Sequence, residues 1–485
     1  MSRPWLITTA MVLLALAGGC RLHDYRDFEA PPLEVPDTWA RAEGAGSERP
    51  ARWWSAFGDA ELEALVERSL DANLDLRQAW SRIDQALARV ENENASVLPA
   101  VSIDGNARFD KSIRSTIASG AFIGGSPAGA DTHGYSVSPR LSYEIDLWGR
   151  LAARRDARTL ELEATVEDLL GTGLVLAAEV TEAWLDLLEQ RSLASVLEAQ
   201  IETGTRQLEL VELRFANGQA NALDVLQQRQ QVARIVSQRP DVARAAALAE
   251  NRLAILCGRA PSDAPAVGRP GLDLVLPPLP SPGHPGDLLD NRPDLRAARA
   301  RLRAADRDVA EAVADRMPRL DLSLSYQFSA TRGGAQFDRE ILDGVLSLLA
   351  PVFDNGLRSS EIDRREARVR ELLDAFRAAY LVALREVEDA LVGEARPRAR
   401  LAALERELAL ADETLGEARA RYAGGVAEYL NVLTSLETRQ GLERTLVSER
   451  RELLGQRVRL YRALGGAGLE GLRRPDDLEI EGEPR

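Results

Sequence analysis

The sequence predicts a mainly α-helical chain of two similar halves, each with long coiled-coil helices and one pair of β-strands. Three observations predict this fold class. Two stretches about 207 residues apart repeat without a gap, the composition favours long helices, and four segments alternate apolar and polar residues. An internal repeat of this size indicates duplicated supersecondary units rather than one globular core.

The clearest repeat is a helical hairpin that occurs twice. The segment 214–226 (RFANGQANALDVL) aligns with 421–433 (RYAGGVAEYLNVL). Upstream of each copy an apolar residue recurs every seven positions: Ala194, Ile201, Leu208 and Phe215, then Leu401, Leu408, Leu415 and Tyr422. Such spacing makes neighbouring helices supercoil around each other. A second repeat, offset by about 219 residues, pairs residues 75–77 and Pro99 with residues 294–296 and Pro318.

Composition and charge exclude several functional classes. The 485 residues include 5% aromatics and three methionines, and the formal net charge is -15. A nucleic-acid partner would require a basic surface, so we expect none. Three histidines and two cysteines show no metal-ligand spacing and no disulfide framework. Residues 171–173 (GTG) lack the preceding strand and third glycine of a dinucleotide fingerprint. We expect no catalytic, metal or cofactor-binding residues, and no enzyme activity.

The N-terminus predicts export. Residues 1–19 form a signal peptide, with Arg3 followed by an apolar stretch too short to span a membrane. Residues 16–20 (LAGGC) resemble a bacterial lipobox, which predicts lipidation (including palmitate) of Cys20 and an outer membrane location. Ala17 stands where the lipobox pattern usually has leucine. An ordinary secretory signal with a coincidental cysteine is the alternative.

Four segments predict β-strands. Residues 135–147 and about 319–330 alternate apolar and polar residues, while about 100–110 and 341–353 do so more weakly. Strands of this length cross a bilayer when tilted, although alternation alone is commoner in soluble sheets. No later segment has 18 uninterrupted apolar residues, so membrane crossing would have to use strands.

Strand number and helix length predict an oligomer that spans a distance. Four strands cannot close a membrane barrel, so several protomers must contribute to one barrel. Residues 148–215 contain no proline, and an unbroken helix of that length would reach about 100 Å.

Several motifs together resemble the TolC-type outer membrane efflux channels, specifically the lipidated NodT branch that serves resistance-nodulation-division (RND) pumps. The motifs are WWSAFGD at 53–59, DLWGR at 146–150, NRPDLRAA at 291–298 and PVFDNG at 351–356, together with the duplicated hairpin. The resemblance covers about residues 30 to 466. Each motif also has a plain structural role, because glycines relieve strain at strand ends and Pro293 suits a first helical turn.

The resemblance implies a homotrimer with a twelve-stranded β-barrel in the outer membrane of a Gram-negative bacterium and an α-helical tunnel in the periplasm. Its domains would be a lipidated extended segment 20–58, a first repeat 59–258, a Pro-rich equatorial linker 259–290, a second repeat 291–466 and a tail 467–485. We expect Pro240 and Pro397 to break or kink helices near the linker.

The function implied is a passive conduit for small molecules, including drugs, in a tripartite efflux pump. Its partners would be outer membrane lipid, a periplasmic adaptor (membrane fusion) protein and an inner membrane RND-type transporter. A lipid-anchored periplasmic coiled-coil scaffold or adaptor, and a channel for type I protein secretion, are alternatives. The scaffold would not need the four strands.

The resemblance places the gate and the adaptor-docking surface at the hairpin tips. Asn217, Gly218, Gly424 and Gly425 stand where a left-handed backbone is favoured at a helix end. Arg214 and Arg421 lie in last helical turns, where they also suit the helix dipole. Candidate aperture residues are Asp224, Asn431 and Thr434. We expect weaker cation preference here, because related channels carry more acidic residues at these positions. A solvated helix-start residue is the alternative for Asp224.

Overall fold

The computed structural model describes residues 22–26, 28, 36–40, 52–110, 132–331, 337, 339–466, 469, 471–472 and 474. The predicted signal peptide and the predicted lipidation site Cys20 lie outside the described residues. Contacts divide the chain into two compact units. Unit 1 comprises Met1–Glu29, Asp84–Glu163 and Arg299–Asp374, and unit 2 comprises Ala30–Ile83, Ala164–Ala298 and Ala375–Arg485.

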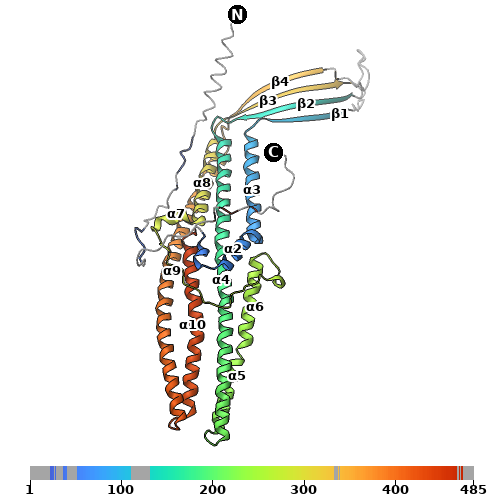
Figure 1. Cartoon of the computed structure of the whole chain (residues 1–485). Helices are drawn as coiled ribbons and strands as arrows, with labels where there is room; N and C mark the ends of the chain where they lie inside the picture. Colours follow the sequence, from blue (N-terminus) through green and yellow to red (C-terminus); the bar gives the residue numbers. More distant parts are fainter. Residues whose placement is uncertain are drawn as a thin grey trace, which may run out of the picture. The chain divides into compact units, whose positions relative to one another are not determined.

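Helices dominate, and one element order occurs twice (Figure 1). The first half contains the 3₁₀ helix η1 (Trp53–Phe57), α2 (Ala60–Ala72), α3 (Leu74–Ser96), β1 (Ala100–Asp110), β2 (Thr132–Ile145), α4 (Arg150–Ala216), α5 (Ala222–Val236) and α6 (Arg239–Leu256). Two 3₁₀ helices, η2 (Pro261–Asp263) and η3 (Pro285–Asp287), and α7 (Leu288–Asn291) follow. The second half contains α8 (Pro293–Ala314), β3 (Arg319–Thr331), β4 (Arg339–Leu349), α9 (Leu357–Ala423) and α10 (Tyr429–Ala463).

In unit 1 the four strands form one antiparallel sheet in the order β1-β2-β3-β4 (Figure 1). Val101 pairs with Leu141 and Leu141 with Leu324, which places apolar side chains on one face. Serines and charged residues dominate the other face in β1, β2 and β3, whereas β4 adds Ile341, Val345 and Leu349 to it. The four-stranded prediction is confirmed, but β4 ends at Leu349 rather than at residue 353. Pro351 cannot donate a ladder hydrogen bond, which explains the earlier end.

The DLWGR motif forms the turn from β2 into α4. Gly149 has φ +73°, and an Oδ2 of Asp146 accepts the backbone N–H of Ala152 at 2.9 Å. The indole of Trp148 donates to the carbonyl of Pro318 at 2.8 Å. These contacts give the motif a structural role in joining strand to helix.

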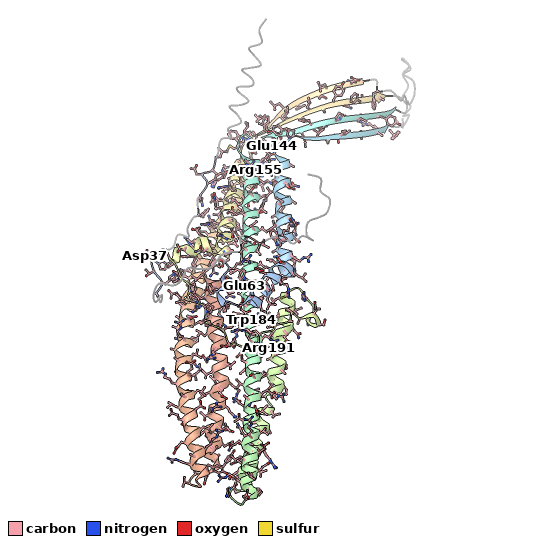
Figure 2. All side chains as sticks on the ribbon, viewed as in Figure 1. Asp37, Glu63, Glu144, Arg155, Trp184 and Arg191 are labelled. Carbon is pink, nitrogen blue, oxygen red and sulfur yellow. The ribbon has the colours of Figure 1, made fainter. Side chains whose placement is uncertain are left out.

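An ion pair continues this junction into the first turn of α4. Glu144, at the end of β2 (Figure 2), accepts two hydrogen bonds from Arg150 at 3.1 and 2.7 Å. One turn further, Arg154 donates to Glu93 of α3 at 3.0 Å. Paired donors in this geometry fix the direction in which the helix leaves the strand.

The core of unit 2 forms around the middle of α4. Trp184 is fully buried there (Figure 2), with apolar residues of α2, α6 and α10 around it. Trp53 and Trp54 of η1 are buried, and Trp53 stacks on Tyr461 with ring centroids 5.6 Å apart. The tryptophan pair therefore packs as a structural element.

The Pro-rich segment between the halves is attached to α4 and α10. Arg191 of α4 (Figure 2) donates to the carbonyls of Val267 and Arg269 at 2.6 and 2.9 Å. Arg457 of α10 is fully buried and donates to the carbonyl of Pro277. The half-buried Arg191 and the buried Arg457 thus satisfy carbonyls that an extended segment cannot pair by itself.

The two interior prolines behave differently. Pro240 lies in the first turn of α6 and separates it from α5, as predicted. Pro397 lies inside α9, which continues to Ala423, so of the predicted break or kink the break does not occur. Proline removes one backbone donor, and a helix of 67 residues keeps enough other bonds to continue. Helix α4 also has 67 residues and is unbroken, as predicted. Within the described chain, no helix combines the length and apolarity needed to span a bilayer.

Candidate functional site

The two hairpin tips have the same backbone turn. We call residues 217–221 the first tip, between α4 and α5, and residues 424–428 the second tip, between α9 and α10. Gly218 and Gly425 have φ +72° and +71°. At each tip the glycine N–H donates to the carbonyl three residues earlier. The N–H of the next residue donates to the carbonyl five residues earlier. This is the Schellman arrangement that glycine favours after a helix, so the predicted left-handed turns are confirmed at these two glycines.

The first tip continues into a side-chain cap. Asn221 accepts the backbone N–H of Asp224 at 2.9 Å, and Asp224 accepts that of Asn221 at 3.4 Å. This reciprocal pair satisfies two donors at the start of α5. Asp224 is therefore a helix-start residue, but with 8% exposure it is not solvated as the alternative prediction supposed.

Asp224 also contacts the other hairpin. The hydroxyl of Tyr422, in the last turn of α9, donates to Oδ2 of Asp224 at 3.3 Å. The guanidinium carbon of Arg214 lies 4.7 Å from the centre of the Tyr422 ring, a cation-π contact. Burial, reinforced by the Asp224 carboxylate, raises the pKa of Tyr422 above its ordinary value. Three side chains thus join the last turns of α4 and α9 to the first turn of α5.

The second tip has no equivalent side-chain cap. Helix α10 follows Glu428, whose side chain makes no capping bond. Arg421 is exposed and donates to Glu417 on its own helix at 2.7 Å. Asn431 and Thr434 are exposed on the first turns of α10. Arg421 and Asn431 share a shallow groove of about 450 Å³ between α9 and α10. In the single chain, these residues are therefore exposed and accessible to other molecules.

A second polar contact between the hairpins lies just above the tips. The hydroxyl of Tyr429 donates to Oε1 of Gln228 at 2.7 Å, and Gln228 donates to the carbonyl of Gly204 at 2.8 Å. Both Tyr429 and Gln228 are fully buried. Burial raises the pKa of Tyr429 above its ordinary value, so the hydroxyl keeps its proton, and its hydrogen bond to Gln228, further into the alkaline range.

The structure brings some predicted residues together and separates others. Arg214 and Asp224 meet around Tyr422, whereas Asn431 and Thr434 lie on the exposed side of α10. The role of Tyr422 is not evident from the repeat, which pairs this residue with Phe215 as a heptad residue. The signal available was the hydroxyl group, which only the second copy carries.

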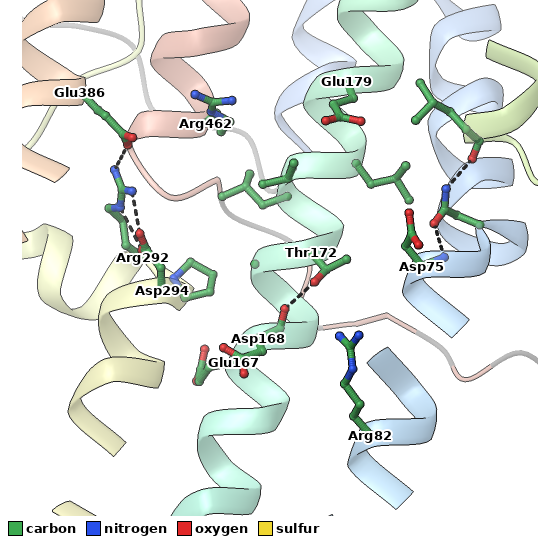
Figure 3. A pocket seen from close by; sticks show the side chains of 17 residues that line it. Asp75, Arg82, Glu167, Asp168, Thr172, Glu179, Arg292, Asp294, Glu386 and Arg462 are labelled. Carbon is green, nitrogen blue, oxygen red and sulfur yellow. Dashed lines mark hydrogen bonds and ion pairs between the residues drawn. The ribbon is translucent and has the colours of Figure 1, made fainter. Parts of the chain in front are cut away.

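A larger groove in unit 2 has a structural explanation. It encloses about 780 Å³ beside α4, and Figure 3 shows Arg292 bound to Asp294 and Glu386 on its wall. Arg292 donates to these carboxylates at distances of 2.7 to 3.0 Å and to the carbonyl of Ala463 at 3.0 Å. The NRPD motif thus ties the start of α8 to α9 and α10. Gly171 borders this groove, with Pro293 opposite it.

Comparison with known proteins decides the family. A family model described as outer membrane efflux protein matches residues 65–259 and 284–466, which is most of the chain. The chain belongs to the outer membrane efflux protein family.

This efflux protein is similar to export proteins along its whole length. It is 32% identical to the pyoverdine export outer membrane protein OpmQ of Pseudomonas aeruginosa, over 96% of this chain and 100% of OpmQ. It is 29% identical to the outer membrane protein OprJ of the same species, over 97% and 98% of the two chains. The solved outer-membrane channel OprN aligns with a TM-score of 0.81 at 26% identity, over 92% of this chain and 99% of OprN. These relatives are export and channel proteins rather than enzymes, and this protein is an outer membrane efflux component.

Proposed function

We propose that three copies of this efflux protein assemble into one channel, with four strands from each copy closing a twelve-stranded barrel. The observation that carries the proposal is the sheet of unit 1. In the described residues β1 pairs only with β2 and β4 only with β3, so both edges are available to other copies. In β1, β2 and β3 one face is apolar and the other polar, as lipid on one side and water on the other require, while β4 carries apolar residues on both faces.

The proposed channel is a passive conduit that a periplasmic adaptor and an inner membrane RND-type transporter supply with small molecules. Its relatives include a pyoverdine export protein, a toluene efflux pump protein and a cation efflux system protein. Because these cargoes share little chemistry, the transporter would select the cargo. The channel would need only a continuous water-filled path, extending from the outer membrane into the periplasm.

We place the gate and the adaptor contact at the hairpin tips. Exposure of Asn217, Gly218, Gly424 and Gly425 supports a docking surface there. In this structure Asp224 accepts a hydrogen bond from Tyr422. It would therefore reach the aperture only when that contact breaks, whereas Asn431 and Thr434 are exposed already. Cys20 would carry the lipid anchor.

The assembly is tested on protein purified from outer membranes in mild detergent. Light scattering should give three times the mass of one chain, and negative-stain images should show an elongated particle with a detergent-covered end. Planar-bilayer recordings should then show discrete channels. A monomer that forms no channel would overturn the proposal and favour the lipid-anchored scaffold.

The role of Asp224 needs a selectivity measurement. Asp224→Asn should lower the cation preference of open channels, measured as a reversal potential in a salt gradient. Asp241→Asn, near the start of α6 and far from the tips in sequence, is the control. Unchanged selectivity in Asp224→Asn would remove this residue from the aperture.

A further inference from the structure

Between the tips and the core of unit 2, the contact between the two hairpins changes from apolar to polar. At the tips an apolar cluster joins both hairpins and reaches Leu436 on α10. The core cluster resumes with Val447 on α10. Between these two residues, α10 contacts α4 and α5 through hydrogen bonds and ion pairs. We call Gln200, Gln231 and Gln440 the amide layer; all three are buried.

One side of the amide layer is fully satisfied. Gln200 of α4 donates to the carbonyl of Gln440 at 3.0 Å and to Glu443 at 2.7 Å. Its carbonyl oxygen accepts from Arg444 at 2.6 Å. Burial lowers the pKa of Arg444, which agrees with a site shielded from water. Every polar group of Gln200 thus has a partner, and α4 is firmly bonded to α10.

The other side is only half satisfied. Gln231 of α5 donates to Oε1 of Gln440 at 2.9 Å, but Oε1 of Gln231 and Nε2 of Gln440 have no partner. Exchanging oxygen and nitrogen in both amides reverses the bond between them, and that bond still satisfies one atom of each amide. Gln231 and Gln440 are 4% and 1% exposed. A buried acceptor and a buried donor without partners are costly to the closed packing, and water would satisfy both.

We propose that the amide layer is the pivot of the gate, at which α5 separates from α10 and admits water while α4 stays bonded to α10. The proposal rests on the tip gate proposed above and goes beyond it by naming where and in which direction the hairpins part. Opening at this layer exposes two orphan groups to water, which favours separation. Opening on the α4 side would break three satisfied hydrogen bonds. It would expose no unsatisfied group of Gln200 to water in return.

The asymmetry predicts an unusual pattern in a double-mutant cycle. Gln231→Leu or Gln440→Leu alone leaves the partner amide entirely unpaired, so each should speed local opening. The double variant Gln231→Leu/Gln440→Leu removes all the unsatisfied atoms with side chains of similar volume. The rate of local opening in the double variant should be lower than in the original protein by about tenfold or more. The control is Gln230→Leu, on the exposed face of the same helix, which should leave opening unchanged.

Hydrogen exchange on the purified, full-length protein in detergent measures this opening directly. We expect amide exchange in α5 around residue 231 to slow in the double variant, with little change in α4 around residue 200. Exchange in α5 that is equal to or faster than in the original protein would overturn the proposal. Equal slowing in α4 and α5 would also overturn it, because the layer would then set only the register of the helices.

Planar-bilayer recording separates this proposal from the proposed function. If the original protein conducts, closed dwell times should lengthen about tenfold in the double variant. Unchanged dwell times with slowed exchange would show that the layer opens without gating, which overturns the pivot. If the original protein forms no channel, the proposed channel function fails by itself, and the exchange result still decides whether α5 separates at this layer.

Discussion

The two hairpin tips share a backbone and differ in their side chains. Both turn through a left-handed glycine with the same pair of backbone bonds. The first tip adds a capping box and a buried carboxylate that accepts from Tyr422, while the second begins α10 without a side-chain cap. The duplicated turn thus preserved the backbone requirement, whereas the side chains specialised. The first tip carries the contact between hairpins, and the second presents exposed polar residues.

The largest effect is expected just above the tips. Gln228→Leu removes the acceptor of the buried Tyr429 hydroxyl and the donor to the Gly204 carbonyl. We expect about 1–3 kcal/mol of lost local stability, because two buried polar groups lose their partner. Hydrogen exchange in α5 and α10 measures it. Adding Tyr429→Phe should recover part of the loss, and a further loss instead would contradict this explanation.

Turn substitutions test whether the two backbones are equivalent. Gly218→Ala and Gly425→Ala each place a Cβ on a left-handed residue, which costs roughly 1–2 kcal/mol. Open space around both glycines means that strain alone sets the cost. Local exchange protection at the two tips should fall by similar amounts. A clear difference between the tips would show that side chains also control the turns.

Substitutions in the first turns of α5 and α10 should affect local stability to different extents. Asp224→Ala removes half of the capping box and the acceptor of Tyr422, so it should cost about 1 kcal/mol. Asn431→Ala, at the aligned position of the second tip, should cost well under about 0.5 kcal/mol because the residue is exposed. The two losses of stability are measured as changes in hydrogen-exchange protection in the first turns of α5 and α10. Equal losses would remove the distinction drawn between the tips.

The smallest effect is a pH dependence at Tyr422. Its pKa is raised by burial and by Asp224, so the folded tip holds the hydroxyl proton more tightly than the unfolded chain does. The contribution is fully present below about pH 10, the ordinary tyrosine pKa, and is lost as pH rises through the higher folded pKa. Closed dwell times recorded between pH 8 and 11 should shorten at the alkaline end. Tyr422→Phe should weaken that trend, and an identical trend would assign it to Tyr429 instead.

The chain's repeats and patterns were enough to predict much of this fold. The four strands follow from period-two alternation, and the unbroken α4 follows from the absence of proline between residues 148 and 215. Gly218 and Gly425 were identifiable as turn residues because few other residues adopt the left-handed conformation cheaply. These features are local, so a sequence can encode them within one or two turns of chain.

Tertiary structure alone decided the rest, because it depends on which distant residues meet. Pro397 reads as a helix breaker, yet α9 continues through it to Ala423. Tyr422 reads as an apolar heptad residue, yet its hydroxyl meets Asp224, a contact across 198 positions of sequence. The partnering of Gln200, and its absence for parts of Gln231 and Gln440, has no signature in a single sequence. Periodicity specifies which face of a helix is buried, whereas the satisfaction of each buried polar atom depends on the packed neighbour.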